Sequence, residues 1–518
     1  MRGYEGRGDM TAEPSQQPII DFLGDPATYG GAPVKRIDTH AASVFLAGDR
    51  ALKIKRAVRF PFLDFSTLEK RKAACEAEIA VNRAYAPSIY RWVTPITRGP
   101  DGKFTIGGKG DPVEWAVEMR RFDHNQTLDH LADAHAIDEG LADALGRAVA
   151  AAHRLAPTVR DAHFSDSLAG IIAQNESELA SEPNLLSLQE LRELANATRE
   201  AFERVKTLLV VREQAGLVRR CHGDLHLGNI VLIDGKPVLF DAIEFDDRIA
   251  TIDVFYDLAF LLMDLVERGL DLAASIVFNR YLLETRRIHD LDVLASLPLF
   301  MSVRAAIRAK VTAARRRQSD SSAEATRTAR DYAVLAQKLM APAKPQLVAI
   351  GGLSGTGKSL LARALAPAIP PLPGAVVLRS DVERKALFGA AETARLPKAA
   401  YTADASAKVY AALAAKARRV LAAGHSAIVD AVFAQPDERA DIARAAGSAA
   451  FQGLFLTAGL ETRIARVDNR TGDASDATAD VVRQQEQFDL GHIRWTKVDA
   501  SGTPEETLLR AQAMIGLR

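Results

Sequence analysis

The feature that most constrains the fold is a phosphate-loop pattern, G-x-x-x-x-G-K-[ST], formed by Gly352, Leu353, Ser354, Gly355, Thr356, Gly357, Lys358 and Ser359. It directly follows an apolar, strand-like run at 347–350 and directly precedes a helical pattern at 360–366. Backbone N–H groups of such a loop point inward toward phosphate oxygens, and the start of the helix adds partial positive charge. The pattern therefore predicts a nucleotide site in an α/β domain with a mostly parallel sheet.

Each polar residue of this site has an expected role. Lys358 reaches the β- and γ-phosphates, and the Ser359 hydroxyl ligates Mg²⁺. Asp381 and Asp430 each end a strand-like run, so both are expected at the phosphate crevice beyond the carboxyl ends of the strands. Asp381 would orient or deprotonate a substrate hydroxyl, and Asp430 would hold Mg²⁺ through water. A helix N-cap is the alternative role for either carboxylate.

Arginines recur on one predicted helical face at Arg463, Arg466 and Arg470, just before a Gly-Asp loop. Such a face is typical of a mobile lid, in which Arg466 would bind nucleotide and Arg470 would stabilise the developing charge of phosphoryl transfer. Ordinary solvated surface is the alternative interpretation.

Residues 346–518 as a whole resemble the P-loop kinases of small molecules, a group with gluconate-kinase-like and zeta-toxin-like members. The resemblance implies a phosphoryl transferase rather than a motor or a switch GTPase. It leaves the acceptor open.

A second motif lies far upstream, in His222-Gly223-Asp224-Leu225-His226-Leu227-Gly228-Asn229. Its spacing is that of a kinase catalytic loop, H-x-D-x-x-x-x-N, and Asp241 follows twelve residues after Asn229. Asp224 is expected to accept the proton of the acceptor hydroxyl, while Asn229 and Asp241 hold Mg²⁺. A zinc site is the competing interpretation, but the sequence has no cysteine pair or histidine pair at zinc-ligand spacing.

The segments HGDLHLGN and LFDAIEFDD strongly resemble the aminoglycoside phosphotransferase-like family, over roughly residues 31–340. The resemblance implies a bilobal α+β kinase-like fold, with a β-rich N-lobe and a helical C-lobe. It also implies a lysine for the ATP phosphates, Lys53 or alternatively Lys55, and a glutamate partner, Glu78 or alternatively Glu76. The hairpin around Gly48 offers no glycine-rich loop, so the expectation is either a looser hold on ATP or contacts from Ser43 and backbone amides instead.

Composition narrows the class of protein further. The 518 residues exceed what one hydrophobic core usually organises, and 66 basic residues balance 66 acidic ones, so net charge gives no support to nucleic-acid binding. Two cysteines are too few for a disulfide scaffold and indicate a reducing cytoplasm. The sequence shows neither a signal peptide nor an apolar run long enough for a membrane span.

The expected order along the chain is a disordered tail at 1–30, a kinase-like domain at 31–340, a linker at 341–346 and a P-loop domain at 347–518. The N-lobe would cover about 31–121 and the C-lobe about 122–340. We expect a bifunctional phosphotransferase acting on hydroxyl groups of small molecules, with ATP, or alternatively GTP, and Mg²⁺. The alternative is a single small-molecule kinase fused to a nucleotide-binding regulatory or toxin-like domain. The sequence does not indicate an oligomeric state.

Overall fold

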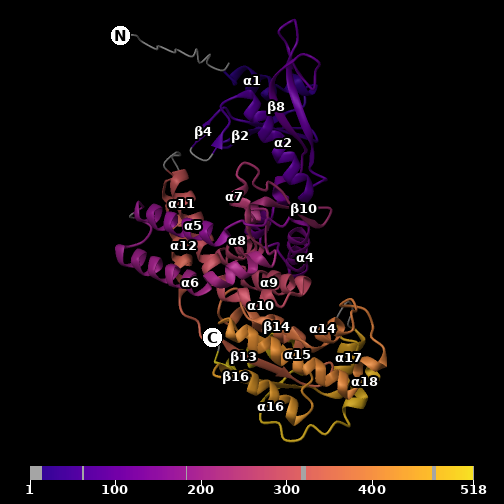
Figure 1. The fold of residues 1–518 in the computed structure, drawn as a ribbon. Helices are drawn as coiled ribbons and strands as arrows, with labels where there is room; N and C mark the ends of the chain where they lie inside the picture. The colour runs from indigo at the N-terminus through magenta and orange to yellow at the C-terminus, as the bar shows by residue number, and fades with distance from the viewer. Residues whose placement is uncertain (1–14, 61–62, 183, 317–321, 470–473, 517–518) are drawn as a thin grey trace. The chain divides into compact units, whose positions relative to one another are not determined.

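The computed structural model describes residues 15–60, 63–182, 184–316, 322–469 and 474–516 (Figure 1). The described chain forms two compact units. The first contains the residues up to Ala136 together with Arg219–Ile252, and the second contains Ile137–Val218 together with the residues from Asp253 onward.

The first unit is built on a six-stranded antiparallel sheet of order β1-β2-β3-β8-β6-β7. Its strands are β1 (Val34–Asp38), β2 (Ala42–Ala47), β3 (Arg50–Lys55), β6 (Tyr90–Arg98), β7 (Phe104–Ile106) and β8 (Asp111–Arg120). The β2–β3 hairpin turns at Gly48, whose positive φ of 56° only glycine adopts readily, as the sequence predicts.

Helix α2 (Leu68–Tyr85) covers the sheet at β8 and β6. The side chain of Thr67 accepts a hydrogen bond from the Lys70 amide and so caps the first turn. The buried face of the helix carries Cys75 beside the polar side chains of Glu78 and Asn82. Buried polar side chains need ion-pair or hydrogen-bond partners. The partners of Glu78 and Asn82 belong to the site described below.

Helix α1 (Gln17–Gly24) differs from the expected disordered tail. Ile19 and Leu23 pack with Phe45, Leu52 and Ile54 in the core of the sheet. Burial of these apolar side chains stabilises a helix that is too short to persist alone.

The catalytic-loop motif continues into a hairpin of β10 (Ile230–Ile233) and β11 (Lys236–Leu239), which turns at Asp234 and Gly235. The motif residues lie before this hairpin and Asp241 directly after it, so the two strands fix the spacing between them. Shorter elements complete the unit: η1 (Pro26–Tyr29), β4 (Arg59–Phe60), β5 (Leu63–Asp64), η2 (His124–Gln126), α3 (Leu128–Asp133), η3 (Leu227–Asn229) and α7 (Asp247–Ala250).

The second unit begins with a helical region. Its main helices are α4 (Glu139–Leu155), α5 (Phe164–Ala180), α6 (Leu188–Gln214), α8 (Val254–Glu267), α9 (Asp271–Thr285), α10 (His289–Asp292), α11 (Leu297–Arg316) and α12 (Ser322–Met340). Helix α8 is buried from Val254 to Val266, which is the behaviour of a helix at the centre of a bundle. No helix within the described ranges has both the length and the apolar character needed to cross a bilayer.

A five-stranded parallel sheet of order β14-β15-β13-β16-β17 forms the rest of the second unit. Its strands are β13 (Gln346–Gly351), β14 (Val376–Arg379), β15 (Ala427–Asp430), β16 (Ala450–Thr457) and β17 (Thr496–Asp499). Its helices are α13 (Lys358–Leu365), α14 (Ser380–Leu387), α15 (Ala403–Ala422), α16 (Pro436–Ala445), α17 (Leu460–Asp468), α18 (Ala479–Gln485) and α19 (Pro504–Met514). The strand-rich first unit, the helical region and the parallel sheet agree with the predicted order of an α+β fold followed by an α/β domain.

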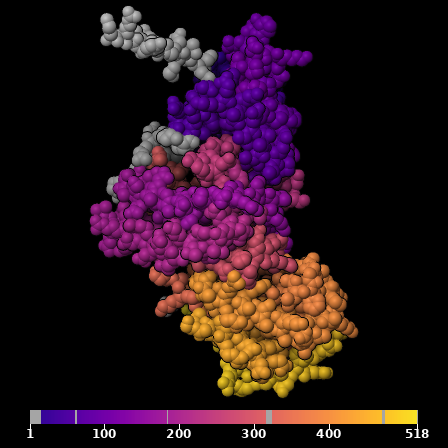
Figure 2. Space-filling view, in the orientation of Figure 1, coloured from indigo at the N-terminus to yellow at the C-terminus, as the bar shows by residue number. Residues whose placement is uncertain are grey.

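Within this unit, helix α9 covers the edge strand β14. The Asn279 amide group donates to the Ala375 carbonyl at 3.2 Å and accepts from the Val377 amide at 2.7 Å. One side chain therefore satisfies two backbone groups of a strand that has no partner strand on that side. Figure 2 shows the helical region, in magenta and pink, in direct contact with the orange P-loop domain.

Removing this contact should loosen the strand edge. In Asn279→Ala we expect faster hydrogen exchange of the Val377 amide, because a net loss of about 1 kcal/mol corresponds to a rise of roughly fivefold. Mass spectrometry of the full-length protein measures it, with Asn196→Ala on the exposed face of α6 as the control. Equal exchange at Val377 in both variants would show that α9 does not stabilise the strand.

Candidate active sites

In the first unit, one lysine lies between two carboxylates. Lys53 Nζ on β3 is 2.9 Å from Glu78 Oε1 on α2 and 2.7 Å from Asp241 Oδ1. Three residues that are far apart in the sequence thus meet at one ammonium group.

The alternative residues lie nearby but have different surroundings. Lys55 Nζ is 2.6 Å from Glu78 Oε2, and its second partner is Glu244, not Asp241. Glu76 is exposed and pairs with Lys72 one helical turn away. Glu78 is fully buried and contacts both lysines. Sequence reasoning missed Glu244, which lies in the resemblance segment LFDAIEFDD.

Electrostatics fixes the charges of this cluster. Burial alone would raise the pKa of Glu78, but Lys53 and Lys55 outweigh it and lower that pKa to about 2. Burial would lower the pKa of Lys53, but Asp241 and Glu78 outweigh it and raise that pKa well above its ordinary value. The glutamate is ionised and Lys53 is protonated at neutral pH.

The catalytic-loop motif places Asp224 and Asn229 in contact. The Asn229 amide nitrogen donates to the backbone carbonyl of Asp224 at 3.0 Å and to its Oδ2 at 3.1 Å. These bonds fix the orientation of both side chains and leave the Asn229 carbonyl oxygen as an acceptor.

The glycine of the motif has a steric reason. Gly223 has a φ of +84°, and a Cβ there would lie 3.2 Å from both the Ala250 Cβ and the Ile243 Cδ1. His226, three residues on, accepts the Gly228 amide at Nδ1, and its Nε2 is 3.5 Å from Asp224 Oδ2. The backbone bond leaves the proton of neutral His226 on Nε2, facing the aspartate.

Asp241 is held in a left-handed backbone conformation, with a φ of +60°. Its amide donates to the Tyr90 hydroxyl at 3.1 Å. The next residue, Ala242, exchanges two hydrogen bonds with the Asn82 side chain, at 2.7 and 3.1 Å. Tyr90 and Asn82 thus offset the strain at Asp241. Sequence reasoning missed both, and no motif marks them.

Ser43, expected near the nucleotide, is fully buried on β2 and donates to Asp38 at 2.6 Å. Its hydroxyl is thus already used within the sheet.

In the second unit, the phosphate loop connects β13 to α13. Three of its glycines, Gly352, Gly355 and Gly357, have positive φ values of 138°, 84° and 90°. At Gly352 a Cβ would lie 2.7 Å from the Leu456 carbonyl oxygen, and at Gly355 it would lie 2.5 Å from that of Arg463. The loop can follow this path only with glycine at these positions.

Two polar side chains of the phosphate loop donate hydrogen bonds to a backbone carbonyl of the same loop. Lys358 Nζ donates to the Leu353 carbonyl at 3.2 Å, and the Thr356 hydroxyl donates to the same carbonyl at 2.8 Å. The Ser354 amide donates to Gln485 Oε1 on α18 at 2.7 Å. Gln485 is a loop contact that sequence reasoning missed.

The two expected metal ligands of this domain are in direct contact. Ser359 Oγ donates to Asp430 Oδ2 at 2.5 Å. The Arg379 guanidinium donates to Ser359 Oγ at 3.1 Å, and its Nε lies 3.5 Å from Asp430 Oδ2. The Ser359 hydroxyl and the Asp430 carboxylate are oxygen ligands of the kind that Mg²⁺ prefers, and the Arg379 guanidinium is bound to both of them. Sequence reasoning missed Arg379.

Asp381 lies in the first turn of α14, near this pair. Burial raises its pKa and the charge of Asp430 raises it further, while Arg379 and Lys358 act in the opposite direction; the net shift is upward. A carboxylate with a raised pKa is a stronger base than an exposed one.

Two arginines of the expected lid, Arg463 and Arg466, lie on α17 (Leu460–Asp468). Arg466 donates to the carbonyls of Ala500 and Gly502, at 2.8 and 2.7 Å, so its guanidinium is bonded to the loop after β17. Arg463 is buried and pairs with Glu486. Arg470 lies outside the described residues. The structure therefore does not show these arginines together at the phosphate loop.

Family models match two parts of the chain. Residues 63–291 match the model described as "Phosphotransferase enzyme family", and residues 347–489 match the model described as "AAA domain". This confirms the predicted fusion of an aminoglycoside phosphotransferase-like domain with a P-loop domain.

The chain is 30% identical over 488 residues to "Uncharacterized protein Rv2004c" of Mycobacterium tuberculosis (strain ATCC 25618 / H37Rv). The match covers 92% of this chain and 94% of the relative. "Uncharacterized protein Mb2027c" of Mycobacterium bovis (strain ATCC BAA-935 / AF2122/97) matches with the same identity and coverage.

Two solved structures match one part of the chain each. A choline/ethanolamine kinase family protein from Mesorhizobium loti is 15% identical, with coverage of 63% of this chain and 95% of that chain and a TM-score of 0.37. A gluconokinase from Sinorhizobium meliloti 1021 is 22% identical, with coverage of 34% and 93% and a TM-score of 0.26. The chain belongs to the family of the mycobacterial proteins and is a phosphotransferase in which a kinase-fold domain precedes a P-loop domain.

Proposed function

We propose that the protein is a bifunctional kinase, in which each domain transfers the terminal phosphate of Mg-ATP to a hydroxyl group of a small molecule. The observation that carries the proposal is the position of Lys53 Nζ between Glu78 and Asp241, with Asp224 and Asn229 contacting each other in the same unit. That set supplies a cation for the phosphates, oxygen ligands for a metal and a proton acceptor.

In the kinase-fold domain, Asp224 accepts the proton of the acceptor hydroxyl, while the Asn229 amide holds its carboxylate in orientation. Lys53 binds the nucleotide phosphates, and Glu78 fixes its position. The Asn229 carbonyl oxygen and the Asp241 carboxylate would hold Mg²⁺, which when bound neutralises phosphate charge.

In the P-loop domain, the backbone amides of 352–359 and Lys358 bind the phosphates. Ser359 and Asp430 would hold Mg²⁺, and Asp381 accepts the acceptor proton. The proposed domain boundaries are 31–340 and 347–518, joined by the linker 341–346. Cys75 and Cys221 are buried and form no disulfide, which fits the cytoplasm as the proposed compartment.

The role of Asp224 is tested by a charge-removing substitution. Asp224→Asn should bind Mg-ATP as the wild type does, while N-terminal turnover falls by roughly 10²–10⁴, the range for a lost general base. Asp241→Asn should instead weaken Mg-ATP binding, because a metal ligand contributes before any bond breaks. Fluorescent-nucleotide titration gives affinity, and ADP release with a panel of hydroxylated metabolites gives turnover, both in a Lys358→Ala background. Full turnover in Asp224→Asn would refute the mechanism.

The number of nucleotide sites is tested at the phosphate loop. Lys358→Ala should reduce the calorimetric stoichiometry of a non-hydrolysable Mg-ATP analogue from two sites to one, because the phosphate cradle loses its positive charge. Lys408→Ala, on the exposed face of α15, should retain both sites. If Lys358→Ala also retained both, the P-loop assignment would be wrong. Loss of ADP release with every acceptor in Asp224→Asn, with stoichiometry unchanged, would favour a regulatory P-loop domain.

The position of Lys53 depends on Glu78. Glu78→Gln leaves two largely buried lysines without their shared carboxylate, so it should destabilise the first unit by about 3–5 kcal/mol. Glu76→Gln, two residues away and exposed, should have little effect. Urea unfolding followed by tryptophan fluorescence measures both variants, since Trp92 and Trp115 lie in that unit. Equal midpoints would show that the buried pairs do not stabilise the fold.

A further inference from the structure

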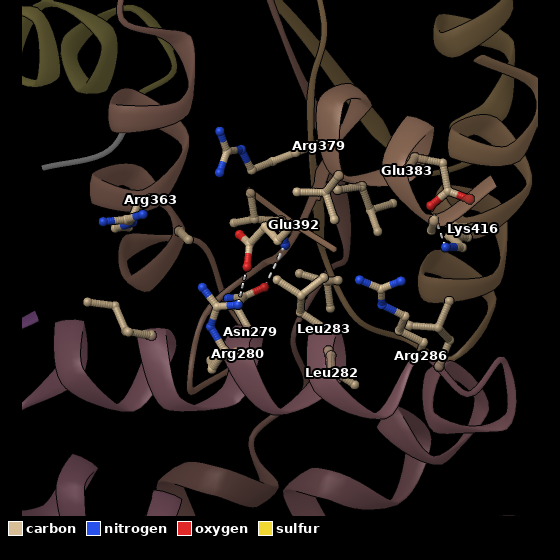
Figure 3. Close-up of a pocket in the computed structure, with 18 of the residues that line it drawn as sticks. Asn279, Arg280, Leu282, Leu283, Arg286, Arg363, Arg379, Glu383, Glu392 and Lys416 are labelled. Atoms are coloured by element: carbon tan, nitrogen blue, oxygen red, sulfur yellow. Dashed lines mark hydrogen bonds and ion pairs between the residues drawn. The ribbon is translucent and has the colours of Figure 1, made fainter. Parts of the chain in front are cut away.

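A cavity of about 450 Å³ lies inside the second unit, beside the phosphate loop (Figure 3). Helix α9 and the residues after it form one wall, and α13, β14, α14 and α15 form the other. Its volume is within the range of about 300–1,000 Å³ that small-molecule sites occupy.

Positive charge dominates the lining. Three carboxylates line the cavity with six basic side chains, which are Arg280, Arg286, Arg287, Arg363, Arg379 and Lys416. All three carboxylates already have partners. Asp143 and Glu392 both pair with Arg280, at 2.5 and 2.7 Å, and Glu383 pairs with Lys416 at 2.5 Å.

Two of the six basic side chains have no counter-ion in the described part of the chain. Arg363 pairs with Glu139, and Arg379 with Asp430. Arg286 and Arg287 have no ion-pair partner among the described residues, and Arg287 Nη1 is buried without a hydrogen bond there. Figure 3 shows Arg286 directed into the cavity from the end of α9. Two guanidinium groups that line one cavity, an exposed one on Arg286 and a partly buried one with a desolvated donor on Arg287, are suited to a multivalent anion.

The rest of the lining defines the body of the ligand. Ile276, Leu282 and Leu283 on one wall, with Val377 and Ala386 on the other, give an apolar surface. We propose that this cavity binds a phosphomonoester with an apolar or ring-shaped body, whose phosphate pairs with Arg286 and Arg287. A phosphate monoester carries about two negative charges and three acceptor oxygens, which match two guanidinium groups better than one carboxylate does. The cavity adjoins the proposed P-loop transfer site, because Ser359 and Arg379 line both, but Arg286 and Arg287 have no role in either proposed transfer reaction.

Phenyl phosphate is a suitable probe, because it joins a ring to a phosphate. It is titrated calorimetrically into the full-length protein saturated with Mg-ADP, so that nucleotide sites are filled. We expect saturable binding, with phenol and inorganic phosphate each at least tenfold weaker, since each lacks one half of the recognised structure. No saturable binding of phenyl phosphate, or equal binding of inorganic phosphate, would overturn the proposal.

Variants locate the site. Arg286→Gln combined with Arg287→Gln should weaken binding at least roughly tenfold, the effect of one lost charge-assisted hydrogen bond or more. Arg204→Gln combined with Arg418→Gln removes the same charge from exposed positions and should leave binding unchanged. Leu283→Trp keeps both arginines and fills the cavity, so it should also abolish binding and serves if the double variant fails to fold. Unchanged affinity in a folded double variant or in Leu283→Trp would contradict the assignment.

Discussion

One buried carboxylate organises the kinase-fold site. Glu78 has no contact with solvent and pairs with two lysines, so its charge and theirs are stable only together. The pair Lys53–Glu78 ties β3 to α2, and the contact of Lys53 with Asp241 extends the tie to the end of the β10–β11 hairpin. The strained backbone at Asp241 is possible because this network and Tyr90 hold it from two sides.

In the P-loop domain too, carboxylates at the site are balanced by a cation, but here the cation is an arginine. Parallel strands bring the phosphate loop, Asp381 and Asp430 to one edge of the sheet, where two carboxylates lie close together. Arg379 compensates part of that negative charge and holds Ser359 and Asp430 through its guanidinium. The guanidinium of Arg379 thus contacts both of the proposed metal ligands, Ser359 and Asp430.

Part of the candidate site could be predicted because its residues stand together in short motifs. The glycines of the phosphate loop belong to one such motif, and Asp224 with Asn229 belongs to the other. Residues that act through long-range packing left no such signal: Asn82, Tyr90 and Glu244 reach the site only because α2 and β6 pack as they do. Helix α1 was missed for the same reason, since Ile19 and Leu23 gain their partners from a sheet formed later in the chain. The arginine spacing on α17 predicted a shared face but could not show that Arg466 bonds to the loop after β17.

The Asn279 contact has a consequence for how the chain avoids self-association. A parallel sheet ends in strands whose outer N–H and C=O groups can pair with any other extended chain, and β14 is such a strand. Here a side-chain amide from α9 satisfies the groups of that edge in the manner of a neighbouring strand. A P-loop domain separated from the helical region would expose the unpaired backbone groups of β14 to other copies of the chain. In the intact chain, α9 covers these groups and so also reduces aggregation through the sheet edge.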